Sequence, residues 1–266
     1  MSFRSEIKLV TPISHLFNDI ENASKIKSLS DELEARERTC DLRFDKTSHY
    51  HIDFDLNLGL NERQKEFLHQ KVKNRSEIDT LTFQITRDTE EFKFKNGKFY
   101  PKGLFIDEKE QLMRIKHSIK IIKDIVGSHR SIGIENNNFY DTGAYEIATS
   151  SKFINKAINS SGCHLLLDIA HAKVTCENKE FDLQKYIKEM TSGITCKQMH
   201  LCDPSQRMVE GKKETYDAHL LPDIHSIDQA VNLCEELKIK HLTIEYYKDT
   251  GKLVDCLKII RKLLNN

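Results

Sequence analysis

The feature that most constrains the fold is a repeated alternation of short apolar runs and longer amphipathic stretches in the C-terminal half of the chain. The apolar runs, which have the length and continuity of buried parallel strands, lie at residues 131–135, 164–168, 195–201 and 240–245. The stretches with helical periodicity lie at residues 145–160, 181–191, 226–237 and 252–264. This repeat predicts a parallel sheet covered by helices.

The N-terminal half is less regular. Its strand candidates are residues 7–10, 39–44, 51–56 and 80–86, and its helix candidates are residues 23–37, 61–72 and 107–126. The candidate at 51–56 follows 39–44 with no room for a helix between them. Eight strands in total predict an α/β fold, a (β/α)₈ TIM barrel that is irregular or incomplete in its N-terminal half. The length suits one domain, residues 1–266.

Composition narrows the function classes. The chain has 41 basic and 41 acidic residues, so its net charge of zero provides no general attraction to nucleic acid or to an anionic membrane. No apolar run is long enough to cross a bilayer, and the N-terminus lacks the apolar stretch of a secretory signal. The seven cysteines include no CxxC pair. We therefore expect a cytoplasmic protein that does not act on nucleic acid.

Potential metal ligands fall at the ends of the predicted strands. Glu135, Asp168 and Glu245 end three of the apolar runs, and His200 lies near the end of a fourth. In a βα barrel the C-terminal ends of the strands converge on the face that carries the active site. Carboxylate and imidazole ligands together suit a divalent ion such as Mn, Fe or Zn. The sequence therefore predicts a metal centre at this mouth.

Two short motifs extend the set. Asp168 and His171 form D-I-A-H, which places His171 about one helical turn beyond a strand end, and Asp217 and His219 form D-A-H. In extended backbone a DxH pair points both side chains to one side, so both can ligate one metal. A second ion bridged to the first by Glu135 or by water follows from this arrangement. Taken alone, Asp168 is more typical of a helix cap.

The order Glu, D-x-x-H, His, D-x-H, Glu between residues 131 and 247 resembles the xylose-isomerase-like and endonuclease-IV-like barrels. Within them, the segments GIENNNFYDTGAYE, LLLDIAHAKV, QMHLCD and LTIEYY are most similar to the multinuclear non-haem iron-dependent oxidases, which modify cysteine and other residues of ribosomally made peptides. The resemblance implies two or three irons, dioxygen as oxidant, and a small partner protein that presents the peptide. This chain has A-H in D-I-A-H where many members have N-N, which indicates a divergent branch.

Residue roles follow from the resemblance alone. It implies that Glu135 bridges the metals, that one metal is completed by Asp168, His200 and Glu245, and that a second is held by His171, Asp217 and His219. It also implies that Asn136 lines the site. For a third metal the candidates are His49 and His51, with His15 as an outside one. Asp88 stands where a histidine is expected, so a two-metal site remains open.

The sequence therefore predicts an iron-dependent oxidase or oxygenase acting on a peptide or small molecule, with Mn or Zn as other metals. The expected catalytic residues are Glu135, Glu245 and His171, and the expected substrate-binding residues are Asn136, Tyr140, Arg207 and Tyr246. Tyr216 is a further candidate, whereas Tyr247 is equally compatible with packing.

Three alternatives stay open. A sugar isomerase or epimerase would use one Mn or Co ion at Glu135, Asp168, His200 and Glu245, and would leave Asp217 and His219 unused. A zinc phosphodiesterase acting on damaged DNA is suggested by HLCDPSQ followed by DAH, although a basic groove is not evident. A non-enzymatic barrel that binds metal or a partner has no positive support in the sequence.

Overall fold

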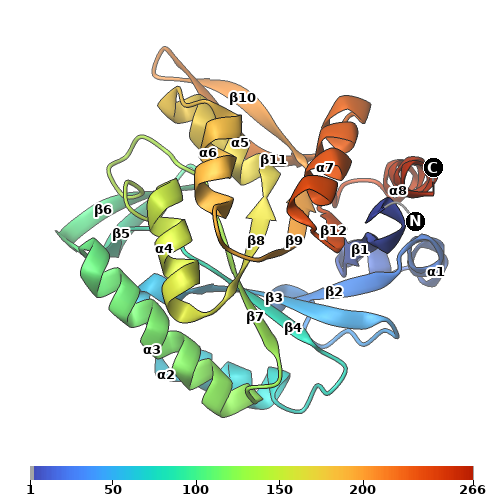
Figure 1. Ribbon diagram of the computed structural model, residues 1–266, viewed down its shortest axis with the longest axis horizontal. Coiled ribbons are helices and arrows are strands. Elements are labelled where there is room, and N and C mark those ends of the chain that lie inside the picture. The colour runs from blue at the N-terminus through green and yellow to red at the C-terminus, as the bar shows by residue number, and fades with distance from the viewer. Residues whose placement is uncertain (1–2, 266) are drawn as a thin grey trace.

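The computed structural model describes residues 3–265, and in these the chain forms a closed barrel of eight parallel strands (Figure 1). Around the barrel the order is β1, β12, β9, β8, β7, β4, β3, β2, and β2 closes it by pairing with β1. The barrel strands are β1 (Lys8–Pro12), β2 (Glu32–Arg36), β3 (Thr47–Asp55), β4 (Thr80–Gln84), β7 (Ser131–Glu135), β8 (His164–Asp168), β9 (Cys196–Leu201) and β12 (His241–Ile244). The predicted (β/α)₈ barrel is confirmed. Residues 1, 2 and 266 of the predicted single domain lie outside the described part.

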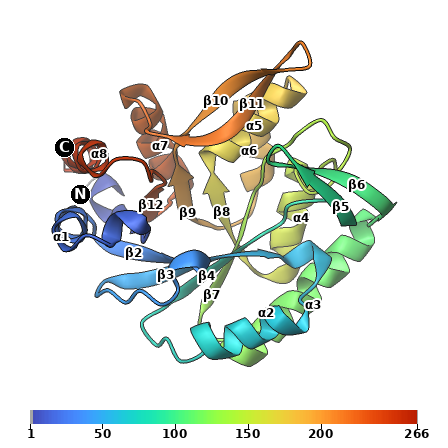
Figure 2. The same cartoon turned by 180° about the vertical axis from the view of Figure 1, so that it is seen from behind.

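Helices surround the barrel (Figures 1 and 2). They are α1 (Ile20–Leu29), α2 (Glu62–Phe67), α3 (Glu108–Val126), α4 (Ser151–Ser161), α5 (Ile169–Lys179), α6 (Leu183–Thr191), α7 (Ile224–Leu237) and α8 (Thr250–Leu264). A π-helical turn, Leu68–Val72, continues α2, and 3₁₀ turns lie at Phe3–Glu6, His15–Phe17, Glu37–Thr39 and Leu56–Leu58. No helix in residues 3–265 is long and apolar enough to cross a membrane.

Aspartate caps set where many of the helices begin. The side chains of Asp19, Asp107, Asp182, Asp223 and Asp249 each accept a hydrogen bond from a backbone N–H in the first turn of α1, α3, α6, α7 and α8. Each such cap is worth about 1 kcal/mol. Helices α1 and α8 come after the barrel strands β1 and β12, so their caps also fix the direction in which the chain leaves the barrel mouth.

The second strand differs from the prediction. Residues 32–36 form β2 and not the end of a helix at 23–37, and the strand expected at 39–44 is absent: these residues are a short turn followed by irregular chain. The sequence ELEAR consists of good helix formers, which is why local propensity pointed to a helix. Its alternation instead sends Glu34 into the barrel and Leu33 and Ala35 into the buried layer beneath the helices, with all three fully buried. Pairing with β1 and β3 therefore overrides the local preference.

Two antiparallel hairpins were not predicted. The first is β5 (Thr89–Lys95) with β6 (Lys98–Phe105), and the second is β10 (Asp203–Val209) with β11 (Lys212–Leu220). Each follows directly after a barrel strand, β4 or β9, so both leave the C-terminal mouth (Figure 2). An ion pair between Lys98 and Glu214 joins the two hairpins. Helix α5 was also missed.

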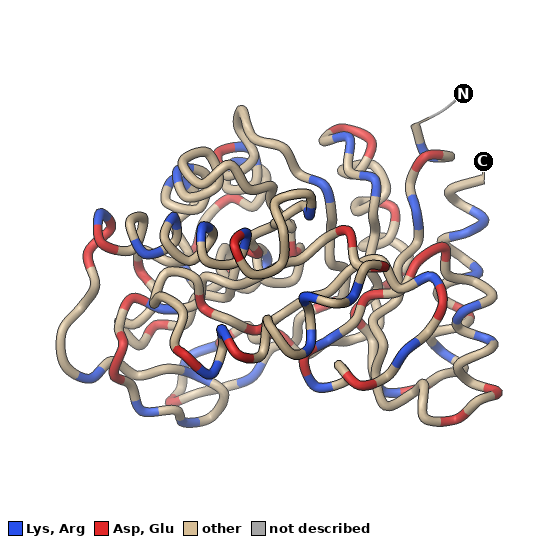
Figure 3. Tube along the Cα trace, turned by 90° about the horizontal axis from the view of Figure 1, so that it is seen from below, with Lys and Arg blue, Asp and Glu red and all other residues tan. Residues whose placement is uncertain are grey.

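Charged residues of both signs are distributed along the whole trace (Figure 3). This agrees with the balanced composition of 41 basic and 41 acidic residues. The hydrophobic core occupies two layers, the barrel interior and the space between barrel and helices, and includes the fully buried Leu9, Leu165 and Leu242.

Candidate metal centre

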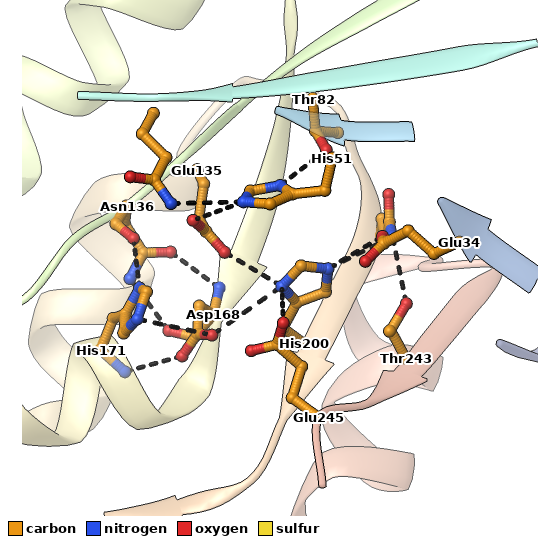
Figure 4. Close-up of polar contacts among 12 residues, drawn as sticks. Glu34, His51, Thr82, Glu135, Asn136, Asp168, His171, His200, Thr243 and Glu245 are labelled. Atoms are coloured by element: carbon orange, nitrogen blue, oxygen red, sulfur yellow. Dashed lines mark hydrogen bonds and ion pairs between the residues drawn. The ribbon is translucent and has the colours of Figure 1, made fainter. Parts of the chain in front are cut away.

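Carboxylates and imidazoles from several strands meet at the C-terminal mouth of the barrel (Figure 4). Glu135 and Asp168 are the last residues of β7 and β8, His200 lies one residue before the end of β9, and Glu245 follows β12 directly. All four are at most 2% exposed. The convergence that the sequence predicted for these strand ends is therefore present.

His200 lies at the centre of the group. Its Nδ1 is 3.0 Å from Glu135 Oε1, 3.4 Å from Glu245 Oε1 and 3.9 Å from Asp168 Oδ2. Its Nε2 lies 3.1 Å from Oε2 of Glu34, the central residue of β2. Because carboxylates accept, the metal-free ring can donate from Nε2 to Glu34 and from Nδ1 to Glu135. A metal ion would replace the proton on Nδ1, and the Nε2–H would go on donating to Glu34.

Asp168 serves two roles at once. Its Oδ1 accepts from the backbone N–H of His171 at 2.7 Å and so caps α5, as its sequence context suggested. Its Oδ2 is buried and meets no hydrogen-bond partner among the described residues. The Asn136 side chain also holds both the N–H and the carbonyl of Asp168, at 2.8 and 2.9 Å. One carboxylate oxygen is thus anchored and the other is free for a ligand.

His171 is oriented by the backbone of Asn136, the residue that follows β7. Its Nδ1 donates to the carbonyl oxygen of Asn136 at 2.8 Å, which turns Nε2 toward Asp217 Oδ2 at 3.5 Å and Asp168 Oδ2 at 3.8 Å. A backbone carbonyl behind one ring nitrogen is a common way to fix the tautomer of a metal-binding histidine. The geometry brings Asp168, His171 and Asp217 together as predicted.

Asp217 and His219 reach the cluster from β11. His219 Nδ1 is 3.3 Å from Asp217 Oδ2, and its Nε2 is 3.5 Å from Glu245 Oε2. The backbone of His219 has a φ of +43°, so the strand is not extended here as the DxH pattern implied. A left-handed non-glycine residue costs of order 1 kcal/mol and is often found where a side chain is held for function. Here the bend carries the His219 ring to Glu245.

The electrostatics show a site that needs positive charge. The pKa of Asp168 is raised to about 7, chiefly by burial; His171 lowers it, and the carboxylates of Glu245, Glu135 and Asp217 raise it. For His200, burial opposes the charged form, but Glu245 and Glu34 outweigh it and raise the pKa well above its usual value. Without metal the site therefore holds protons, and a divalent cation would replace them.

The early histidines divide between the two ends of the barrel. His51 Nε2 is 3.6 Å from Glu135 Oε2, and its Nδ1 is 2.9 Å from the hydroxyl of Thr82, so His51 belongs to the cluster. His49 does not: it lies two residues nearer the start of β3 and contacts Glu32 at 2.8 Å. The exposed His15 lines the cavity rim only.

Asp88, found in place of an expected histidine, has a structural role. It lies beyond the end of β4 and accepts backbone hydrogen bonds from Ile147 and Ala148 at 2.7 and 2.8 Å, with a third from the Gln111 side chain at 3.1 Å. It thereby ties the loop before α4 to the barrel. The residue that ends β4 and faces the cluster is Gln84, whose Nε2 is 3.2 Å from His51 Nε2.

Several residues of the cluster were not predicted from the sequence. Glu34 and Arg36 were hidden because their segment was assigned to a helix, although E-L-E-A-R alternates with the period of a strand. Arg36 pairs with Glu34 at 2.5 Å and with Glu245. The buried Cys202, 3.7 Å from Asp217 Oδ1, gave no signal beyond its place after His200 and the strand end.

A cavity of about 1120 Å³ opens onto the cluster. This volume is slightly above the usual range for small-molecule sites and leaves room for a segment of peptide. Its wall includes Arg36, Phe99, Asn137 and Tyr247, together with Glu135 and other members of the cluster. Phe99 comes from the first hairpin and His219 from the second, so the hairpins flank the entrance.

None of the four predicted substrate-binding residues is among those that line this cavity. Asn136 is fully buried, and its side chain holds the backbone of Asp168. Tyr246 packs in the main core, whereas its neighbour Tyr247 lines the cavity and donates to Glu245 Oε1 at 3.1 Å. The two adjacent tyrosines thus exchange the roles expected of them. Arg207 stacks over Tyr216 at 4.6 Å and pairs with Glu214 within the second hairpin. Tyr140 is buried in a small aromatic cluster beneath the hairpins.

The donors present fit divalent metal ions. Glu135 Oε2 and Asp168 Oδ2 are buried oxygens without a hydrogen-bond partner in the part of the chain that is described. Ligand atoms lie within 4.8 Å of one another in several overlapping groups: His51, Glu135 and His200; Glu135, Asp168 and His171; Glu34, His200 and Glu245; and Cys202, Asp217 and His219. The overlap at Glu135 and His200 means that neighbouring ions could share ligands.

Comparison with known families gives one match over half the chain. A family model described as "RiPP precursor modification enzyme MbnB/TglH/ChrH" matches residues 104–249, which include all seven of the strand-end and motif ligands predicted from the sequence. A curated relative, a "UPF0276 protein" of Psychromonas ingrahamii (strain DSM 17664 / CCUG 51855 / 37), is 30% identical over 90 residues. That match spans 34% of this chain and about a third (31%) of the relative's own length.

Solved structures show the same barrel at low identity. D-psicose 3-epimerase in the presence of D-fructose aligns with a TM-score of 0.60 at 12% identity, covering 97% of this chain and 98% of that one. Endonuclease IV from Thermus thermophilus gives 0.58 at 12%, covering 97% and 99%. The apo form of 3-keto-D-glucoside 4-epimerase from E. coli gives 0.58 at 10%, covering 96% and 99%. These likenesses extend to the fold alone.

Proposed function

The chain belongs to the family of RiPP precursor modification enzymes MbnB/TglH/ChrH, and from this premise we propose that it is a multinuclear iron-dependent oxidase or oxygenase. Its substrate, on this proposal, is a ribosomally made precursor peptide. Membership accounts for the enzyme class, and the metal, its oxidation chemistry and the peptide are the parts that we propose.

The observation that carries the multinuclear proposal is the position of Asp217 and His219. Together with His171 they form a second group of donors beside Glu135, Asp168, His200 and Glu245. These side chains are more ligands than a single ion binds. We therefore assign one ion to Asp168, His200 and Glu245, a second to His171, Asp217 and His219, and Glu135 to a bridge between ions.

Charge balance supports at least two ions. The cluster contains the carboxylates of Glu34, Glu135, Asp168, Asp217 and Glu245, and Arg36 is the fixed positive charge that pairs with two of them. Neutral imidazoles cannot compensate the remaining carboxylates in a buried site, where uncompensated charge is costly. Two divalent cations would do so. The group formed by His51, Glu135 and His200 is the candidate location for a third.

Iron in this site would bind dioxygen and substrate side by side and would supply the redox chemistry of the reaction. The chain contributes position and polarity. Tyr247 and Arg36 both contact Glu245 and both face the cavity, so they hold that carboxylate and present a hydroxyl and a guanidinium to the substrate. We propose these two as substrate-orienting groups, in place of Tyr246 and Arg207.

The peptide would enter between the two hairpins. The cavity wall there combines the apolar Phe99 with the polar Asn137 and Asn138, which suits an extended peptide with both side-chain and backbone contacts. We also propose that a small partner protein presents the peptide, as the family resemblance implies.

Metal content tests the proposal directly. Protein purified without oxygen is expected to hold two or more irons per chain and to show visible absorbance on exposure to air. The same preparation should consume dioxygen continuously, beyond the amount that oxidises its iron, only when a cysteine-bearing precursor peptide is added. A single manganese with epimerase activity on a ketose, or three zincs with cleavage at abasic sites in DNA, would contradict the proposal and favour the other chemistries of this fold.

A further inference from the structure

A second group of metal-binding side chains lies at the opposite, N-terminal mouth of the barrel. Glu32 and His241 are the first residues of β2 and β12, and His49 is near the start of β3. One ligand atom from each lies within 4.8 Å of the others. The strands β12, β1, β2 and β3 are consecutive neighbours, so the three side chains bracket β1. None of them takes part in the function proposed above.

The three residues converge on one oxygen atom. Oε2 of Glu32 is 2.8 Å from His49 Nε2 and 3.6 Å from His241 Nε2. The two imidazole rings are 4.6 Å apart and meet edge to face at 67°. Zinc bonds of 2.0–2.2 Å place the ligand atoms of a tetrahedral site about 3.4 Å apart. The two separations lie on either side of this value, so small side-chain movements would complete the geometry.

The tautomer of His241 leaves a lone pair facing this carboxylate. Its Nδ1 lies 3.3 Å from the carbonyl oxygen of Lys197, which can only accept, so Nδ1 carries the proton. In the neutral ring the other nitrogen, Nε2, then keeps its lone pair. Its Nε2 lone pair therefore points at the Glu32 oxygen, and two acceptors face each other across 3.6 Å. A cation between them would turn this repulsion into attraction.

We propose that Glu32, His49 and His241 form a zinc site that is separate from the candidate catalytic cluster. Two imidazoles and one carboxylate are a usual donor set for Zn²⁺, with water in the fourth position. The Lys197 carbonyl behind His241 is the outer contact that such a ligand requires. On binding, His49 Nε2 gives its proton to solvent, because that atom becomes a ligand.

The neighbours of Glu32 set the strength of this site. Lys8 on β1 pairs with Oε1 of Glu32, and the Ser48 hydroxyl donates to Oε2 at 2.6 Å. Zinc would therefore take Oε2 as a single-oxygen ligand beside a positive charge, which weakens binding. Lys8 is 53% exposed and can be replaced without opening the core.

The location suggests what the ion would do. The barrel closes where β1, its first strand, pairs with β12, its last, and with β2. A metal held by β12, β2 and β3 would cross-link this seam from both sides of β1. The role is therefore structural: zinc would stabilise barrel closure by binding the folded state only.

The experiment compares the content, affinity and position of bound zinc in proteins whose candidate catalytic cluster is already loaded with metal. Wild type is compared with His241→Ala, Lys8→Ala and the control His225→Ala, at an exposed histidine of α7. His241→Ala is expected to bind one zinc fewer per chain than wild type and His225→Ala. Lys8→Ala is expected to bind this zinc roughly fivefold more tightly, because a nearby positive charge is removed. Crystals soaked in zinc should show an anomalous peak among the three side chains.

Two results would overturn the proposal. One is the absence of an anomalous peak at the N-terminal mouth with equal zinc content in all four proteins. The other is a zinc whose affinity does not change in Lys8→Ala, which would indicate an adventitious ion only. The Lys8 variant keeps the test decisive even if His241→Ala folds poorly, since its expected effect is a gain of affinity. If the zinc proposal fails, the iron proposal for the candidate catalytic cluster is unaffected, because the two sites share no residue.

Discussion

The Glu34 carboxylate accepts a hydrogen bond from His200 Nε2 over 3.1 Å, and this contact decides which ring nitrogen faces the candidate metal cluster. Both side chains are fully buried, and they come from strands β2 and β9, far apart in the sequence. A carboxylate behind the imidazole fixes its tautomer and makes the opposite nitrogen a better donor to a metal. The metal-facing role of Nδ1 thus depends on Glu34, the buried carboxylate on the other side of the ring.

Replacing Glu34 by Gln should weaken metal binding. The amide oxygen can still accept from His200, but without charge it makes the imidazole a poorer donor, and loss of such an outer contact typically costs 10- to 100-fold in metal affinity. The measurement is competition for metal against a chelator of known affinity. Glu177→Gln, at an exposed position on α5, is the matched control. Equal affinity in the two variants would remove Glu34 from the metal centre.

His219→Ala should remove one metal ion while leaving the fold intact. The His219 side chain is 35% exposed, so its truncation opens no core cavity, and its ring contacts both Asp217 and Glu245. We expect iron content to fall by one ion per chain and turnover of the peptide to fall at least 100-fold. Elemental analysis and dioxygen uptake check this, with His225→Ala as control. Full iron content in His219→Ala would show that His219 is not a ligand of the second ion.

Asp88→Ala should destabilise the protein without changing its metal content. The substitution removes the hydrogen-bond acceptor of three buried donors: the backbone N–H groups of Ile147 and Ala148 and the side-chain amide of Gln111. Buried donors left without partners cost about 1–3 kcal/mol each, so a loss of about 3 kcal/mol in the free energy of unfolding is expected. Urea denaturation measures the loss. A fall in iron content with unchanged stability would instead make Asp88 a ligand.

His164 should make the metal-free protein sensitive to acid. Burial, with smaller effects from Lys197, His49 and His241, lowers the pKa of His164 to about 3. The unfolded chain takes up this proton near pH 6.5 and the native chain does not, so stability is lost as the pH falls below about 6.5. Between pH 7 and pH 5 this one group costs about 2 kcal/mol.

The variant His164→Gln isolates that contribution. It retains a polar contact to Ser131, which lies 3.1 Å from His164 Nδ1, and removes the titration. Urea midpoints at pH 7 and pH 5, measured in chelator, should shift less in this variant than in wild type. Identical shifts in the two proteins would mean that His164 is protonated in the native state.

The sequence alone determined the barrel and the part of the site that lies on its regular strands. Glu135, Asp168 and Glu245 follow continuous apolar runs, and in a parallel barrel such strand ends have only one place to converge. The D-I-A-H motif placed His171 correctly because a cap and the helix that follows it are local structure. These inferences hold because they depend on contacts within a few residues and on the geometry of one repeated unit.

What only the tertiary structure decided are contacts between segments far apart in the chain. Glu34 and Arg36 join the cluster because β2 pairs with β1 and β3, although ELEAR by itself favours a helix. His49 and His51 lie toward opposite ends of the barrel because of where β3 is in register with β2 and β4. Tyr247, just beyond β12, lines the cavity, whereas Tyr246 packs in the core. Register moves a side chain between environments in steps of one residue, and pairing partners elsewhere in the chain set it. Local sequence therefore determines which potential ligands the chain contains, and strand pairing determines which of them meet in one site.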